Sequence, residues 1–290
     1  MAFASPEADL TIEGAMLTHV GRVRQSNEDC VAFVIPPPAD PAAARGFLCI
    51  VADGMGGHAA GEVASRMAVE VVRRVYYSLQ GPVPNSLEAA FASANRAIFE
   101  ESQSTPECRG MGTTCTALAI RKNDLWFAHV GDTRAYLLRD GRLSQLTEDQ
   151  TLHAEMIRQG LMAEEDAKNA EGGNVILQAL GTGLDLSPAL PESGIPIVES
   201  DLLILCSDGL WNLVNDGEIS GIAGHFAPPE ACQKLLERAL EAGGYDNISV
   251  GVFAIRAAGG VAKEPTAATR PIESAYSATT KKRWRLARGA

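Results

Sequence analysis

Carboxylates stand at the ends of several hydrophobic runs in this chain, each next to a turn. The sharpest example is the apolar run 47–52, which ends in Asp53 and a glycine-rich turn beginning at Gly54. Glycine lets a backbone approach a ligand closely, so this carboxylate stands at a corner with room around it. A single such aspartate is ordinary turn chemistry. Five such corners together predict a site for hard, oxygen-preferring cations; the other four are Asn27-Glu28-Asp29, Val130-Gly131-Asp132, Leu205-Cys206-Ser207-Asp208-Gly209 and Tyr245-Asp246-Asn247.

The charge of the chain is unevenly distributed. The net charge is -11, but residues 258–290 hold seven basic and two acidic residues, which leaves -16 on residues 1–257. An acidic body argues against a nucleic-acid groove, because phosphate backbones require a basic face. It suits divalent cations, although excess carboxylate also serves plain solubility. The composition of the basic tail, 258–290, predicts disorder.

The length and the hydrophobic pattern predict one domain over residues 1–257, since no internal repeat or linker interrupts it. Six cysteines without a CxxC pair indicate buried, reduced thiols and a reducing compartment. The N-terminus lacks the basic and apolar regions of a signal peptide, and no apolar stretch reaches membrane-spanning length. We therefore expect a cytoplasmic protein with no membrane span.

The coarse secondary structure alternates runs of strands with paired helices, which favours an α+β layered fold over a doubly wound one. Segment 151–190 is polar and partly helical, and we interpret it as a surface excursion from the sheet. Asp140-Gly141 predicts a hairpin turn. The expected helices are 61–79, 85 or 86 to 102 (capped by Asn85 or Ser86), 152–159 and 229–242. The expected strands are 15–21, 30–35, 47–53, 113–120, 125–130, 135–138, 142–146, 201–206 and 248–255.

Six short motifs stand in a fixed order along the chain: Arg24-Gln-Ser-Asn27-Glu28-Asp29, Asp53-Gly-Met-Gly-Gly-His58, Gly112-Thr113-Thr114, Gly131-Asp132-Thr133-Arg134, Ser207-Asp208-Gly209-Leu-Trp211 and Asp246-Asn247-Ile248. In this order they resemble the metal-dependent type 2C protein serine/threonine phosphatases (the PPM family), in the bacterial single-domain form. The resemblance covers about residues 14–256. It implies a four-layer α-β-β-α sandwich, in which two antiparallel sheets are flanked by helices and a metal channel opens at one edge.

The resemblance also implies roles for individual residues. Asp53 would bridge two Mn²⁺ or Mg²⁺ ions, with the Gly54 carbonyl joining one of them. The other implied ligands are Asp208 and Asp246 on the second ion, Glu28 and Asp29 through metal-bound waters, and Asp132 with Asp208 around a third, weaker metal.

Three further residues have uses near such a site. Arg24 would be the phosphate clamp, because a guanidinium can grip two phosphoryl oxygens at once. His58 would either protonate the leaving alkoxide or only order its loop, since family members with a histidine here place it at the position of Met55. Trp211 is expected to pack beneath the site. The remaining histidines (His19, His129, His153 and His225) are expected in core or surface roles.

The resemblance implies hydrolysis of phosphoserine and phosphothreonine in proteins, by in-line attack of a metal-bridging hydroxide. The enzyme would act as a monomer in bacterial signal transduction, opposing a Ser/Thr protein kinase, with that kinase and its substrates as partners. One alternative is a phosphatase dedicated to a single regulatory phosphoprotein. Another is a non-catalytic scaffold of the same fold, although such loss usually removes the metal carboxylates, which are all present here. A metal nuclease conflicts with the acidic body. The acidic stretch 164–166 suggests the hypothesis of a preference for basic phosphopeptides.

Overall fold

The structure, a computed structural model, describes residues 10–56, 60–167 and 175–257. All of these residues belong to one compact unit, which ends at Ala258. The predicted disorder of the tail therefore lies outside the described residues.

Two antiparallel sheets form the centre of the molecule. The first contains, in spatial order, β1 (Leu10–His19), β11 (Ile248–Ala257), β10 (Leu202–Cys206), β7 (Arg134–Arg139) and β8 (Arg142–Gln145). The second contains β2 (Asp29–Val34), β3 (Phe47–Met55), β5 (Cys115–Arg121), β6 (Asp124–Val130) and β9 (Ile195–Pro196), and the short strand β4 (Gly112–Thr113) pairs with the end of β3.

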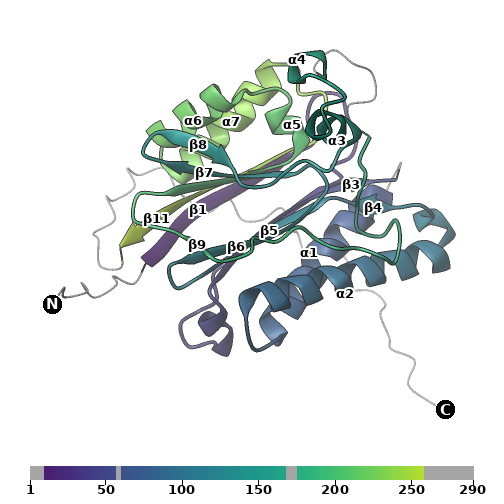
Figure 1. Cartoon of the computed structure of the whole chain (residues 1–290), viewed down its shortest axis with the longest axis horizontal. Coiled ribbons are helices and arrows are strands. Elements are labelled where there is room, and N and C mark those ends of the chain that lie inside the picture. The colour runs from purple at the N-terminus through teal and green to yellow at the C-terminus, as the bar shows by residue number, and fades with distance from the viewer. Residues whose placement is uncertain (1–9, 57–59, 168–174, 258–290) are drawn as a thin grey trace. The chain divides into compact units, whose positions relative to one another are not determined.

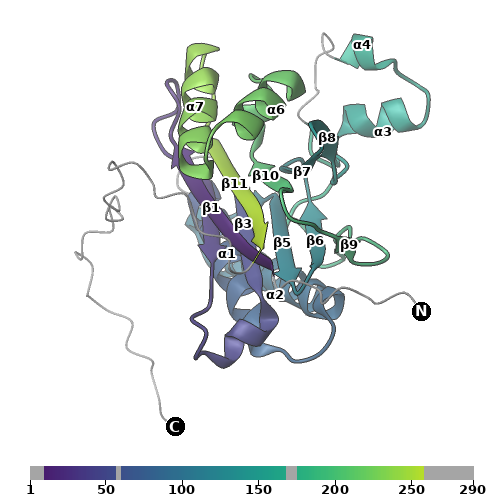
Figure 2. The same ribbon diagram turned by 90° about the vertical axis from the view of Figure 1, so that its left-hand side faces the viewer.

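Helices cover the outer face of each sheet, as Figures 1 and 2 show. The long pair α1 (Ala60–Ser78) and α2 (Val83–Ser104) packs on the second sheet, and α6 (Asp216–His225) and α7 (Pro228–Glu241) pack on the first. The short helices α3 (Leu152–Arg158) and α4 (Glu164–Ala167) lie at one edge of the sandwich in both views. The one-turn helix α5 (Asp208–Trp211) directly follows β10, and two 3-10 turns lie at Pro41–Arg45 and Pro106–Cys108. The predicted four-layer α-β-β-α sandwich is confirmed.

Strand β3 shows why the layers form. Its side chains alternate between the two faces of the sheet, so Leu48 and Ile50 enter the core beneath α1 and α2, while Cys49 and Val51 enter the core between the sheets. All four are fully buried. A strand buried on both faces reads as a continuous apolar run, and that run carries Asp53 to the edge of the core.

Several sequence predictions match the structure closely. The hairpin turn between β7 and β8 has Asp140 at φ 51° and Gly141 at φ 77°, the left-handed conformations that the Asp-Gly pair favours. The structure contains no disulfide among the described residues: all six cysteines are free, and five of them are buried. No helix in the described part of the chain has both the length and the hydrophobicity of a membrane span.

Other predictions were wrong in detail. Helix α2 begins at Val83 and has Pro84 in its first turn, a position that suits proline, so Ser86 is a buried residue inside the helix and not its cap. The predicted strand 113–120 is interrupted at Thr114, which separates β4 from β5. Segment 151–190 is not wholly superficial, since Leu180 is fully buried and exchanges two backbone hydrogen bonds with Thr113.

Helix α6 was not predicted from the sequence. Asn215 and Glu218 form a capping box at its start, a signal that was readable in the sequence.

Candidate metal centre

The acidic corners converge because their strands meet at the same end of the sandwich. In the second sheet, Asp29 at the start of β2 pairs with Asp53 near the end of β3, and Val51 pairs with Thr116 near the start of β5. In the first sheet, Cys206 at the end of β10 pairs with the start of β7 and lies opposite Val250 of β11. The residues that precede or follow these strand ends therefore come together, and they include Asp132, Asp208 and Asp246.

The Asp29 carboxylate joins the two sheets. Its Oδ2 accepts hydrogen bonds from the hydroxyl of Ser207 (2.7 Å) and from the hydroxyl of Ser249 (2.6 Å), both of which belong to the opposite sheet or its ends. The Ser249 amide in turn donates to the Ser207 hydroxyl at 2.9 Å. The two serines were not predicted as site residues, although Ser207 stands inside one of the six motifs.

Mutual repulsion and burial raise the pKa of the clustered carboxyls. Burial, with the nearby charges of Asp29, Asp208, Asp132 and Asp246, raises the pKa of Asp53 well above its ordinary value. Burial first, and then Asp208 and Asp246, raise the pKa of Asp29 to about 7, against the lowering effect of its serine hydroxyls. Burial and the charge of Asp246 raise the pKa of Asp208 to about 6. Such a group of carboxyls is unfavourable when ionised unless cations offset the repulsion.

The predicted third-metal carboxylate belongs to the same group. Burial raises the pKa of Asp132 to about 7, and the charge of Asp208 is the next cause. Asp132 therefore lies within electrostatic reach of both Asp53 and Asp208.

Two carboxylate oxygens of the cluster lack hydrogen-bond partners. Both Asp29 Oδ1 and Asp208 Oδ1 are buried without one. Buried polar atoms without partners are rare and call for a specific cause. Carboxylate oxygens are the ligands that hard divalent cations prefer, so the donor set fits Mn²⁺ or Mg²⁺.

Two glycines make room around Glu28. A Cβ on Gly61 would overlap the carboxylate of Glu28, and a Cβ on Gly54 would overlap the backbone of Gly61 and of Glu28. The Gly54 amide donates to the Glu28 carbonyl at 3.1 Å, which fixes the corner after Asp53. The N-terminal turn of α1, the end of β3 and the start of β2 thus pack backbone against backbone.

The loop that carries Arg24 is fixed by Asn247. The Asn247 side chain donates to the carbonyls of Val20 (3.0 Å) and Ser26 (2.9 Å), and its Oδ1 accepts from the Glu28 amide at 2.7 Å. The role of this asparagine was not predicted, although it too stands in one of the six motifs. It orients both Glu28 and the loop that follows β1.

Arg24 itself contacts the cluster at Asp246. Its Nη2 donates to Asp246 Oδ2 at 2.7 Å, and its side chain is 53% exposed. A hydrogen bond to Asp246 raises the pKa of Arg24, and Glu28 and Asp53 add to this effect. The guanidinium therefore stands between solvent and the carboxylates, with donors left for a further anion.

The backbone of Asp53 is held by two threonines. Its amide donates to the Thr114 hydroxyl at 3.2 Å, and its carbonyl accepts from the Thr113 hydroxyl (2.8 Å) and from the Thr114 amide (2.9 Å). Both threonines stand in one of the six motifs, and their hydrogen bonds fix the backbone that carries the Asp53 carboxylate.

The remaining histidine predictions have different outcomes. His58 lies outside the described residues, so its role stays a prediction. His129 is fully buried, with its ring nitrogens on the Thr116 hydroxyl and the Glu148 carbonyl, and burial lowers its pKa to about 4. It is a neutral core residue.

The carboxylates do not form a closed cage. Among the residues with described positions, no three Asp, Glu, His or Cys side chains are arranged to hold an ion by themselves. Mg²⁺ usually keeps several waters and takes few protein ligands. Carbonyl and water oxygens would have to complete the coordination here.

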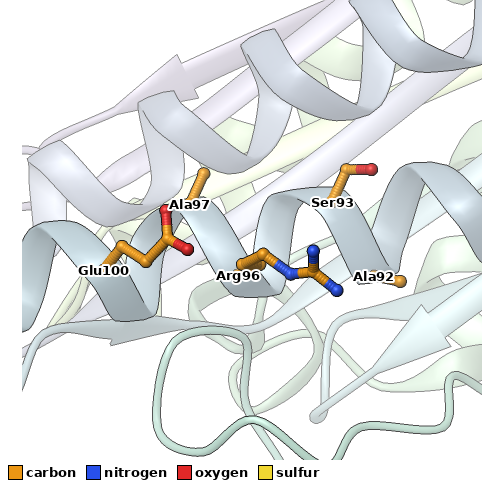
Figure 3. Close-up of a pocket in the computed structure, with 5 residues that line it drawn as sticks. All are labelled: Ala92, Ser93, Arg96, Ala97 and Glu100. Atoms are coloured by element: carbon orange, nitrogen blue, oxygen red, sulfur yellow. The ribbon is translucent and has the colours of Figure 1, made fainter.

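A groove of about 240 Å³ on α2 is separate from this cluster. Ala92, Ser93, Arg96, Ala97 and Glu100 line it, all from one helix (Figure 3). It contains none of the predicted site residues.

Known proteins that are similar to this chain in sequence and fold are phosphatases. The sequence profile of the family "Protein phosphatase 2C" matches residues 39–241. The chain is 37% identical over 242 residues to the serine/threonine protein phosphatase PstP of Mycobacterium tuberculosis, a match that covers 83% of this chain and 44% of that protein. It is 35% identical over 239 residues to the serine/threonine phosphatase stp of Listeria welshimeri, covering 80% of this chain and 92% of that protein.

A solved phosphatase structure is also similar to this chain. The catalytic domain of the serine threonine protein phosphatase PstP, in complex with two manganese ions, superposes with a TM-score of 0.74 at 35% identity, and the match covers 85% of this chain and 99% of that one. The chain thus spans less than half of the Mycobacterium tuberculosis protein and nearly all of the Listeria protein.

Proposed function

The chain belongs to the protein phosphatase 2C family, and we propose that it hydrolyses phosphoserine and phosphothreonine in proteins with two divalent cations bound at the acidic cluster. The observation that carries the proposal is the buried group of carboxyls whose pKa values are raised by burial and by one another, with partnerless oxygens on Asp29 and Asp208. A folded protein tolerates such a group when cations bind there.

The residues divide into those that hold cations and those that hold substrate. The charges of four other aspartates act on Asp53, so we assign it the role of bridging the two ions. The proposed cation set is completed by the Gly54 carbonyl, Asp208 and Asp246, with Glu28 and Asp29 orienting the bound waters and Asp132 serving a third ion. When bound, Mn²⁺ or Mg²⁺ would lower the pKa of a water and neutralise charge on the phosphoryl oxygens.

Arg24 would hold the phosphoryl group. Its half-exposed guanidinium donates one hydrogen bond to Asp246, so its other N–H groups can donate to two phosphoryl oxygens. His58 would donate a proton to the leaving alkoxide or would order its loop.

The proposal can be tested on a phosphothreonine peptide. Activity should require added Mn²⁺ or Mg²⁺, should vanish in EDTA, and should fall at least about 100-fold in Asp53→Asn and Asp208→Asn, because each removes a charge from the cation site. The exposed Asp124→Asn on β6 is the control and should keep full activity. Undiminished activity in EDTA would refute the metal mechanism.

A separate measurement addresses Arg24. Arg24→Ala should raise KM for the phosphopeptide about 10-fold or more, while Mn²⁺ affinity changes less, because the side chain binds the phosphoryl group rather than the cation. An unchanged KM would remove Arg24 from the substrate site.

We further infer that the substrates are phosphoproteins of a bacterial Ser/Thr kinase, the kinase included, and that the chain acts as a cytoplasmic monomer. The names of the bacterial relatives, which are serine/threonine phosphatases, support the substrate class. A broad phosphopeptide screen separates a general phosphatase from one dedicated to a single partner. Binding of Mn²⁺ without hydrolysis of any phosphoprotein would favour the scaffold alternative.

A further inference from the structure

Trp211 links the two carboxylates proposed for the weakest cation. It is the last residue of α5, whose first residue is Asp208, so its indole and the Asp208 carboxylate belong to the same helical turn. The indole Nε1 donates a hydrogen bond of 3.0 Å to the backbone carbonyl of Asp132. The relative position of Asp132 and Asp208 is therefore set through one side chain.

Arg134 fixes the plane of that indole. The guanidinium carbon lies 3.6 Å from the centroid of the Trp211 ring, which is close cation–π stacking. Arg134 is held in turn by Asp149, whose two carboxylate oxygens accept from Nε (2.9 Å) and Nη2 (2.6 Å), and Nη1 donates to the Tyr136 hydroxyl at 3.2 Å. The side chains of Arg134 and Asp149 are only 19% and 12% exposed, so water competes little with these bonds.

Gln150, the residue after Asp149, holds Gly131, the residue before Asp132. The Gln150 amide donates to the Gly131 carbonyl at 2.8 Å, and its side-chain oxygen accepts from the Gly131 amide at 2.9 Å. Gly131 has φ +102°, and a Cβ there would overlap Thr114, so this tight corner requires glycine. Gln150 thus acts on Asp132 through the neighbouring Gly131, and Asp149 acts on it through Arg134 and Trp211.

We propose that Trp211 and Arg134 are positioning residues that set the spacing between Asp132 and Asp208 and so determine how tightly a divalent cation binds between these two carboxylates. The inference rests on the proposed function only in taking Asp132 as a cation ligand. Neither side chain touches the reacting atoms. They act by fixing a backbone carbonyl and a helical turn, as hydrogen-bonded supports of metal ligands do in general.

The chain offers a matched control on the same strand. Arg139 of β7 forms the same kind of bidentate pair with Asp201, through Nε (2.8 Å) and Nη2 (2.6 Å). Asp201 is buried, and neither residue belongs to the acidic cluster. A general loss of stability from breaking such a pair should therefore appear in Arg139→Lys as well, whereas a loss of positioning should not.

The test is a Mn²⁺ titration of the full chain, with free Mn²⁺ followed by electron paramagnetic resonance. The weakest Mn²⁺-binding step is identified by its loss in Asp132→Asn. The Mn²⁺ affinity of this step should fall about 10-fold in both Trp211→Phe and Arg134→Lys. Trp211→Phe keeps an aromatic ring and removes the N–H donor, while Arg134→Lys keeps the charge and removes the planar, bidentate contact. The tighter steps, and all steps in Arg139→Lys, should match the parent chain.

Three results would overturn the inference: no Asp132-dependent step in the parent, parent-like isotherms in both positioning variants, or equal weakening in Arg139→Lys. Far-UV circular dichroism checks that each variant is folded. If Trp211→Phe does not fold, the Mn²⁺ affinity of Arg134→Lys alone decides whether the inference holds. Because the readout is binding, a chain inactive on phosphopeptides that still shows this pattern would refute the phosphatase proposal and leave the positioning role standing.

Discussion

Asp29→Asn should make the cation-free protein more stable while it lowers the proposed phosphatase activity. Asp29 is buried, and burial, with Asp208 and Asp246, raises its pKa from an ordinary 3.8 to about 7. A difference of about three pKa units corresponds to about 4 kcal/mol against the ionised folded form. Asparagine is neutral and keeps an oxygen for the hydroxyls of Ser207 and Ser249, but it places an NH₂ group that lacks an assured acceptor, at a cost of about 1–2 kcal/mol.

The net expectation at pH 8 in EDTA is a gain of about 2 kcal/mol in the free energy of unfolding, or about 5 °C in Tm for a domain of this size. Urea denaturation followed by circular dichroism measures it. At pH 5.5 the gain should shrink, because the parent carboxyl is then protonated and neutral in the folded state. In saturating Mn²⁺ the order should reverse, since the parent gains more binding energy than the variant.

A second buried aspartate provides the control. Asp201 is also buried but pairs with Arg139, so Asp201→Asn should lower the free energy of unfolding by about 3 kcal/mol under the same conditions. If Asp29→Asn were instead less stable than the parent at pH 8 in EDTA, the argument from burial and repulsion at this site would be wrong.

Two further predictions concern pH and backbone space. In EDTA, the protein should become more stable as pH falls from 8 to 5.5: the site carboxyls have raised pKa values, so protonated forms stabilise the fold at low pH, and this stability is lost as pH rises through about 6 to 7. His129, whose pKa is lowered to about 4, opposes the trend below pH 6.5 without cancelling it. Thermal melts across this range check the sign, and a Tm that falls on acidification would contradict it. Gly61→Ala should weaken Mn²⁺ binding about 10-fold, because the new methyl group displaces the Glu28 carboxylate, whereas Gly221→Ala in α6 meets open space and should raise stability by up to about 1 kcal/mol. Calorimetric titration and urea melts of both variants measure these effects, and equal Mn²⁺ affinities would contradict the first.

The sequence allowed the acidic corners to be predicted because each is local. Asp53 ends an apolar run, and Asp140-Gly141 turns a hairpin, and both signals lie within a few residues. The pairing of the strands could not be predicted in this way. The contacts that fix Asp29 come from serines 178 and 220 residues away, and a serine within an apolar run carries no sign of such a partner.

Helix α6 was missed for a different reason. Its ten residues include three glycines, which lower helix propensity, and the helix is stabilised by its capping box and by packing of Ile219 on the first sheet. The positioning contacts of Trp211 likewise depend on tertiary structure, since the indole meets the carbonyl of a residue 79 positions earlier.

The place of β11 in the first sheet has a consequence for how the protein is made. This strand begins at Ile248, yet it lies between β1, which starts at Leu10, and β10. On the ribosome, β1 therefore has no neighbour in its sheet until almost the whole described chain has been synthesised, and Asp246 and Ser249 emerge just as late. Contacts between such distant segments form slowly. A nascent chain consequently has no assembled acidic cluster until β11 has been synthesised, and the site can bind cations only after that point.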